Sequence, residues 1–229
     1  MAASQFLLML DKAISLCAAC PALTPISEAL QDNRADEIGE AAQFRSPEEG
    51  KQYATPEAHH LSRAVFLQAL GIDPQKPSDF PLYKLKDNEN IWELVGVLLI
   101  AERTIPHEAH IVLQALEKVF PDQFADNQQN ARRRHYLADH YEHDRKIHYP
   151  ELLEGATNAL MNLPEEQKTE ALQQIRHGAQ RFVEERGKLY DHNLKILRAR
   201  NSLGQQSQEE GLNYLLMAQE LCAQQRTYT

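Results

Sequence analysis

One stretch constrains the fold of this chain more than any other, because residues 135–154 carry four of the ten histidines in a sequence of 229 residues. No residue inside this stretch interrupts a helix before Pro150. On a helix, residues four positions apart lie on one face, so His140, Asp144 and His148 are stacked along one side. The stretch therefore predicts a helix that carries a row of metal-ligand side chains.

The polar row shares its side of the helix with apolar residues, namely Leu137, Tyr141 and Ile147. An amphipathic helix turns such a side toward the core of the protein. Buried carboxylates are costly unless they are paired or bind a metal. The combination of two imidazoles and one carboxylate on an apolar side therefore predicts a metal site.

Two other interpretations of this stretch are open at the level of the sequence. The helix can be an exposed, charged one whose histidines have no common role. Asp144 can also be half of a structural ion pair, for example with Arg63 or Lys146. In every case His135 and His143 fall on the opposite face, and we expect them to face solvent.

The composition of the rest of the chain predicts an all-α fold in a single domain over residues 1–229. Leu, Ala, Gln and Glu dominate, which favours helix, and no segment alternates as a strand does. The net charge of −9 argues against a nucleic-acid partner, and no apolar run is long enough for a membrane span. Three cysteines, an odd number, predict a cytoplasmic protein.

Prolines and glycines divide the chain into amphipathic helices joined by short loops, the pattern of a helical bundle. Thr24 with Pro25, and Thr55 with Pro56, are helix-start signals, and Asn88 or Asp87 is expected to cap a strongly apolar helix. The expected helices cover residues 3–19, 24 to about 41, 55–71, about 88 onward, 106–120, about 121–150, 150 to about 161, 164 to about 204 and about 207–224.

Other helices also place a polar residue where an apolar stripe continues. Glu37 extends the stripe of the second helix, and Glu102 extends that of the fourth. His59 lies on the apolar face of the third helix, and His60 lies about 100° away from it. A mixed set of oxygen and nitrogen donors with open positions suits two redox-active iron ions. The candidate ligands are Glu37, His59 or His60, Glu102, His140, Asp144 and His148.

These residues resemble the signature of the haem-oxygenase-like diiron oxidases. In that family Asn-x-x-Asp-Glu-x-Gly precedes a helix that a His opens and Ala-Leu-Gly ends; here residues 33–39 and 59–71 have this pattern. The second half of the family has a Glu late in an apolar helix and then His-x-x-x-Asp-x-x-His. Glu102 and the segment 140–148 are similar, with one residue more in the last spacing. The resemblance covers roughly residues 5–195, and we expect the family's opening helix to be missing.

The resemblance implies a haem-oxygenase-like bundle and an iron-dependent oxygenase or oxidase. Two Fe(II) ions, with dioxygen as co-substrate, would oxidise a small organic substrate. The implied metal ligands are Glu37, His59, Glu102, His140, Asp144 and His148, with the choice between His59 and His60 open. A homodimer is compatible with this family.

Two function classes remain as alternatives to the iron enzyme. One is a metal-free enzyme on the same fold, like the TenA-like thiamin-salvage enzymes or the cofactorless pyrroloquinoline-quinone synthase. The other is a helical interaction protein without enzymatic activity.

Overall fold

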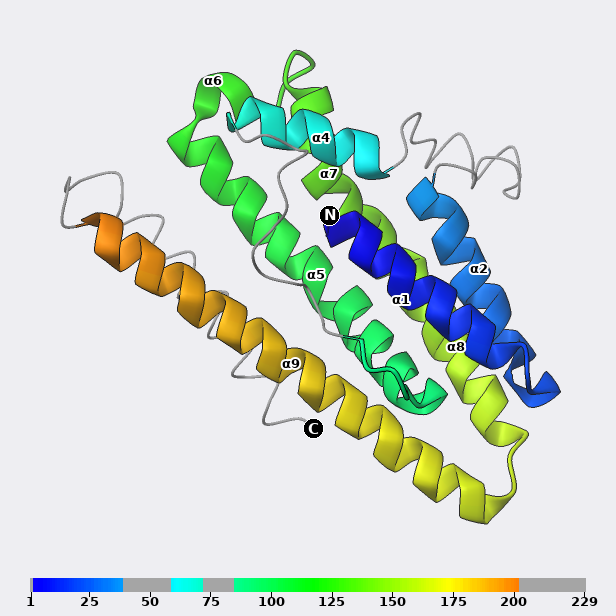
Figure 1. The fold of residues 1–229 in the computed structure, drawn as a ribbon. Coiled ribbons are helices and arrows are strands. Elements are labelled where there is room, and N and C mark those ends of the chain that lie inside the picture. Colours follow the sequence, from blue (N-terminus) through cyan, green and yellow to red (C-terminus); the bar gives the residue numbers. More distant parts are fainter. Residues whose placement is uncertain (1, 39–58, 72–84, 202–229) are drawn as a thin grey trace.

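The computed structural model describes residues 2–38, 59–71 and 85–201, and all regular structure in these ranges is helical, as the sequence predicts (Figure 1). The expected helix over residues 207–224, the start of the helix expected at Thr55, and the side chains of His59 and His60 lie outside the description. The elements are α1 (Ala2–Cys17), the 3-10 turn η1 (Pro21–Leu23), α2 (Thr24–Ile38), α4 (His59–Ala69), α5 (Ile91–Val119), α6 (Pro121–Phe124), α7 (Ala131–Asp139), the π-turn η3 (His140–Asp144), α8 (His148–Met161) and α9 (Glu165–Asn201).

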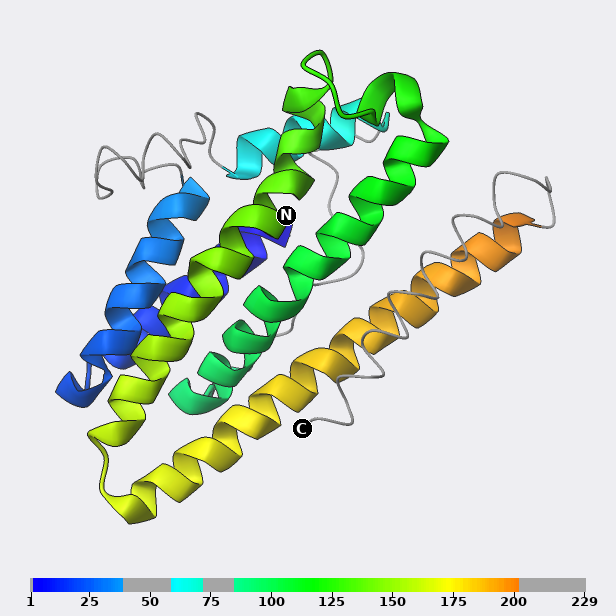
Figure 2. The ribbon, with the colours of Figure 1, turned by 180° about the vertical axis from the view of Figure 1, so that it is seen from behind.

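The long helix α5 lies at the centre of the described bundle (Figures 1 and 2). On one side α9 packs along it, and on the other side α1, α7, η3 and α8 contact it. Helix α2 packs between α1 and α8, while α4 crosses α7 at one end of the molecule. Within the described part of the chain, no helix is both long enough and apolar enough to cross a membrane.

The apolar core consists of two clusters, which meet α5 at different levels. The larger cluster joins α1, α2, α8, the first half of α5 and Phe182 of α9. The smaller cluster joins Phe66 of α4 to side chains of α5, α6 and α7. Along α5, Ala101 belongs to the larger cluster and Ala109 to the smaller one. Between these two alanines Ile105 still packs against the larger cluster, but Glu102, Thr104 and Glu108 are buried polar residues, so the apolar core has a polar gap at this level.

Helix α5 differs from its predicted form at two points. Its N-cap is Asn90, whose side-chain oxygen accepts hydrogen bonds from the backbone N–H groups of Trp92 and Glu93, so the expected cap at Asn88 or Asp87 is wrong. Pro106 lies inside the helix and does not begin a new one. A proline has no N–H group, so the helical hydrogen bond to the carbonyl of Glu102 is absent. The packing of Pro106 in the interior offsets this loss.

The segment around residues 131–150 is not the single α-helix that its sequence predicts. It is divided into α7, the π-turn η3 and α8, and Ile147 separates the last two with φ −120° and ψ −69°. Pro150 lies in the first turn of α8, where a missing N–H group costs nothing. The helix therefore breaks before Pro150, and the prediction of its end there is wrong.

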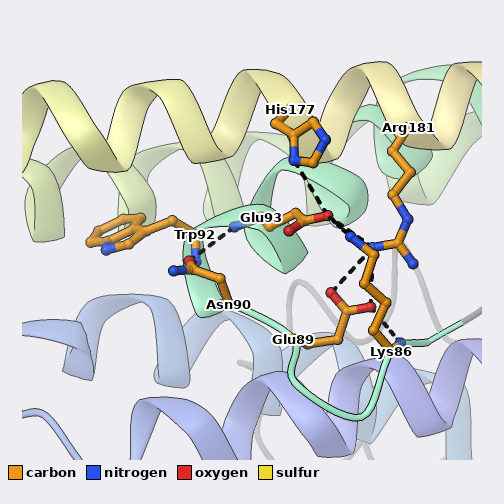
Figure 3. Close-up of polar contacts among 7 residues, drawn as sticks. All are labelled: Lys86, Glu89, Asn90, Trp92, Glu93, His177 and Arg181. Atoms are coloured by element: carbon orange, nitrogen blue, oxygen red, sulfur yellow. Dashed lines mark hydrogen bonds and ion pairs between the residues drawn. The ribbon is translucent and has the colours of Figure 1, made fainter.

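Helices α5 and α9 are held together by a close backbone contact and by a group of ion pairs. A Cβ atom on Gly178 would overlap the carbonyl oxygen of Glu93, and one on Gly96 would overlap that of Ile175. Figure 3 shows Arg181 of α9 beside two carboxylates at the start of α5; its Nη1 lies 2.8 Å from Glu93 Oε1 and 3.2 Å from Glu89 Oε1. These contacts fix the axial position of α5 relative to α9.

We expect Gly178→Ala to destabilise the protein by about 1–3 kcal/mol, because the new methyl group overlaps backbone that cannot move without separating α5 from α9. The gain in helix propensity from replacing Gly, about 1 kcal/mol, is too small to reverse the sign. Urea unfolding measures the change. Gln173→Ala, an exposed substitution on the same helix, is the control and should change stability by less than about 0.5 kcal/mol. An unchanged midpoint for Gly178→Ala would contradict the close helix contact.

Candidate metal centre

The gap between the two apolar clusters contains most of the predicted ligands. Glu37 lies at the end of α2, Glu102 in α5, His140 and Asp144 in η3, and His148 at the start of α8. All are buried except His140, which is half-buried with a side chain 13% exposed. The structure brings these five residues from four elements to one region, while the position of the His59 side chain is outside the description.

Three of the ligand types form a compact group around His148. Its Nδ1 atom lies 3.3 Å from Asp144 Oδ1 and 3.8 Å from Glu102 Oε2. One donor atom from each of the three residues lies within 4.8 Å of the other two. His140 Nδ1 lies 2.5 Å from the other oxygen of Asp144, and Asn33 Nδ2 donates a hydrogen bond of 2.6 Å to Glu102 Oε1. Each carboxylate thus has one oxygen occupied by a neighbour and one directed toward His148.

A second group meets on the other nitrogen of the same imidazole. His148 Nε2 and His143 Nε2 each lie 2.8 Å from Asp36 Oδ2. These three residues also have donor atoms within 4.8 Å of one another. His148 therefore lies between two groups of acids, with Asp36 on its Nε2 side and with Glu102 and Asp144 on its Nδ1 side.

The sequence interpretation missed Asp36 and placed His143 wrongly. His143 is 4% exposed and does not face solvent, and His135 is half-buried with its Nε2 atom in the interior. The reason is that η3 packs against α5 while the adjoining α8 packs against α2, so this segment buries a wider arc than one stripe. His143 lies only about 60° from His140 on a helix, inside that wider arc. The one signal in the sequence for Asp36 was the family motif at residues 33–39, in which Asp36 precedes Glu37.

Burial and neighbouring charges move the pKa values of Glu102 and Asp144, the two carboxylates that face His148, in opposite directions. Burial first, and the negative charge of Asp144 second, raise the pKa of Glu102 to about 8, and the charge of Glu37 adds to this effect. Burial also acts to raise the pKa of Asp144, but the charge and hydrogen bond of His140 and the nearby imidazole of His148 outweigh it and lower that pKa. Without a cation, Asp144 is therefore ionised and Glu102 holds a proton at neutral pH.

On the Nε2 side of the imidazole, His148 and Asp36 form a charged pair. Burial acts against the charged form of His148, but the 3.3 Å approach to Asp144 and the hydrogen bond to Asp36 raise its pKa well above the ordinary value. Burial likewise opposes ionised Asp36, yet the hydrogen bonds from His143 and His148 hold its pKa well below the ordinary range. The imidazolium of His148 thus supplies the positive charge that the buried acids require.

The donor set fits a metal cation in its chemistry. Carboxylates and imidazoles without thiolates suit iron, manganese or zinc, and thiolates are absent from both described groups. Asp144 Oδ1 is buried and accepts no hydrogen bond, since the 3.3 Å approach of His148 Nδ1 is not aligned as one. When Nε2 of His148 carries the proton donated to Asp36, Nδ1 offers a lone pair toward Glu102 and Asp144. A cation there would replace the protons that Glu102 and His148 hold.

Comparison of this chain with protein-family models, with curated proteins and with solved structures gives no match in any of the three. The interpretation of the site therefore rests on its own geometry. That geometry consists of a buried group of acids and imidazoles drawn from α2, α5, η3 and α8.

We expect the metal-free protein to be more stable at about pH 5.5 than at about pH 8.5. Glu102 and His148 both bind protons more tightly in the folded state than their ordinary values of 4.5 and 6.5 allow in the unfolded chain. Stability from such groups is present at low pH and is lost as pH rises through the folded pKa. The depressed pKa values of Asp36 and Asp144 act in the opposite direction, but only below about pH 4.

Urea unfolding of chelator-treated protein at the two pH values tests this expectation. Glu102→Gln mimics the protonated acid and should flatten the dependence on pH. Glu142→Gln, an exposed acid in the same π-turn, should leave it unchanged. Equal stability of the parent protein at both pH values would show that the buried acids do not hold extra protons.

Proposed function

We propose that this chain is a non-haem diiron oxygenase or oxidase with a haem-oxygenase-like fold, which oxidises a small organic substrate with dioxygen. The observation that carries the proposal is the convergence of Glu102 of α5 with Asp144 and His148, which come from a distant segment of the sequence, in a gap of the apolar core. Buried acids of this kind are paired or bind metal ions. The resemblance to the family signature supports iron as the metal.

In this proposal, Glu102, Asp144 and His148 would hold one iron ion. Glu37, His140 and His59 are the residues that would complete the site for a second ion. Bound Fe(II) supplies the ability to activate dioxygen, which no amino-acid side chain has. The carboxylates bring the negative charge that two divalent cations need.

Asp36 has the role of a positioning residue in the same proposal. It accepts hydrogen bonds from Nε2 of both His148 and His143 and so fixes the orientation of two rings. A carboxylate behind a metal-bound imidazole also selects its tautomer and increases its basicity. Asp36 therefore prepares His148 Nδ1 to act as a ligand without binding the metal itself.

Asn33 and the apolar side chains prepare Glu102. The amide of Asn33 holds Oε1, which leaves Oε2 on the side of His148. One turn before Glu102, Leu98 is fully buried, as is the adjacent Ala101. These side chains exclude water, which strengthens every charge interaction in the site.

A metal-free acid–base enzyme is the second candidate, and one observation favours it. Glu102 and Asp144 are neighbouring carboxyl groups whose pKa values are moved in opposite directions. Such a separation is what general acid–base catalysis needs, with Glu102 as the acid and Asp144 as the base. This candidate requires no bound iron, so metal analysis separates the two functions.

The test of the main proposal is the iron content after anaerobic loading with Fe(II) and removal of excess metal. We expect about two irons per chain, the stoichiometry of a diiron site. Asp144→Asn should lose at least one of them, whereas the exposed control Glu142→Gln should keep both. Absence of iron from the loaded parent protein would rule out the diiron function and leave the acid–base candidate. Unchanged iron in Asp144→Asn would remove Asp144 from the ligand set.

Asp144→Asn should also destabilise the metal-free protein by about 3–5 kcal/mol, because it removes a carboxylate that faces the buried, positively charged imidazole of His148 and contacts His140. The same urea unfolding experiment at neutral pH measures this change. Glu142→Gln breaks only an exposed ion pair with Lys146 and should cost less than about 1 kcal/mol. A loss as small as that of the control would mean that Asp144 is not the counter-ion of His140 and His148.

Asp36→Asn should weaken metal affinity by about 10–100-fold while the number of metal sites stays the same. The weakening follows because an amide is a poorer acceptor than a carboxylate for the Nε2–H of His148. Competition with a chromophoric chelator measures affinity and stoichiometry together. Loss of a whole metal equivalent would instead make Asp36 a ligand, and unchanged affinity would exclude the positioning role.

A further inference from the structure

Outside the candidate metal centre, three basic side chains (His107, His110 and Arg145) contact the ring of Tyr141, and Arg103 lies one helical turn before His107. Arg103, His107 and His110 are spaced i, i+4 and i+7 on α5, so they lie on one face of that helix. Tyr141 belongs to η3, and Arg145 directly follows η3. The group, which we term the Tyr141 cluster, therefore spans the contact between α5 and η3.

Three side chains of the Tyr141 cluster contact its aromatic ring. The His110 ring stacks on Tyr141 with a centroid distance of 4.1 Å and an interplanar angle of 20°. The His107 ring approaches it edge-on at 6.2 Å, and the guanidinium carbon of Arg145 lies 4.9 Å from the ring centroid. The tyrosine ring thus keeps two imidazoles and one guanidinium close to one another.

Within the described part of the chain, the two arginines of the Tyr141 cluster have no acidic partner. Neither Arg103 nor Arg145 forms an ion pair with any residue in the described ranges. Glu142 is adjacent to Tyr141 in the sequence, but it pairs with Lys146. Burial, followed by the charges of Arg145, His110 and Arg103, lowers the pKa of His107, and no acid opposes this effect. The cluster is therefore a local site of positive charge on a chain whose net charge is −9.

We propose that the Tyr141 cluster binds a small oxyanion, either free phosphate or the carboxylate or phosphate end of a small molecule. Like charges held close together repel one another, and a bound anion removes this repulsion. Guanidinium groups match the geometry of oxyanions and bind them through paired hydrogen bonds. Imidazole N–H groups of His107 and His110 add further donors.

The dimensions of the cluster favour a small ligand over a macromolecule. Three of its four basic side chains contact a single ring, whereas a specific protein interface buries about 800 Å² on each partner. The net charge of −9 also disfavours a nucleic-acid backbone. A compact group of donors around one ring is suited to one oxyanion.

The cluster is adjacent to the candidate metal centre along the chain. Arg103 directly follows Glu102, and Arg145 directly follows Asp144. A bound anion would consequently lie within about one helix diameter, roughly 10 Å, of the proposed ligands. If the proposed oxygenase function holds, this position would anchor the charged end of its substrate. Anion binding itself does not depend on that function.

The test is isothermal titration calorimetry of the full chain with inorganic phosphate and, separately, with acetate. We expect binding both to metal-free and to iron-loaded protein, because the cluster contains none of the proposed metal ligands. Arg145→Gln and Arg103→Gln should each weaken binding at least tenfold, which is about 1.4 kcal/mol. Arg176→Gln removes the same charge from an exposed position on α9 and should not change it.

Tighter binding of phosphate than of acetate would identify a phosphate site, and the reverse would identify a carboxylate site. Absence of binding for both anions would overturn the proposal, as would equal weakening by Arg176→Gln. Binding that requires iron would also overturn it, because it would place the anion on the metal. Circular dichroism checks that each variant is folded, and Arg103→Gln, at an exposed position, provides the test if Arg145→Gln fails to fold.

Discussion

The burial of several carboxylates in one small volume is the constraint on which the described structure depends. Glu102 and Asp144 are buried and Asp36 is half-buried, and an isolated negative charge in such surroundings is very unfavourable. His148 resolves this problem, because its two nitrogens face acids on opposite sides. The helices that carry these acids can therefore approach one another only when the imidazole lies between them.

The position of α5 links this polar group to the rest of the bundle. Glu102 reaches His148 only if α5 is set correctly along its axis, and the glycines of α5 and α9 fix that setting through backbone contact. The ion pairs of Arg181 with Glu89 and Glu93 stabilise the same contact from the end of α5 (Figure 3). Packing on the outer face of α5 thus determines the geometry on its inner face.

Helix periodicity predicted the all-α architecture, and it placed Asp144 and His148, four residues apart, on one side of their segment, where both are buried. It did not predict the inward position of His143, which depends on packing against both α2 and α5. It also failed at Pro106, since a proline is a start signal locally and only tertiary packing makes it tolerable inside a helix. Interactions that belong to two or more elements are those that a single helix pattern does not contain.

The π-turn η3 affects the directions of the side chains throughout the site. π-turns are uncommon and often lie at functional sites, where they redirect side chains that a regular helix would orient elsewhere. Here the turn joins the His140–Asp144 pair, and the break at Ile147 then lets α8 begin with His148 directed to both acid groups. One neutral imidazole can donate a proton through one nitrogen and a lone pair through the other. A metal on the Nδ1 side would therefore keep the Nε2–H bond to Asp36 intact, so the same framework is suited to hold either a proton or a cation.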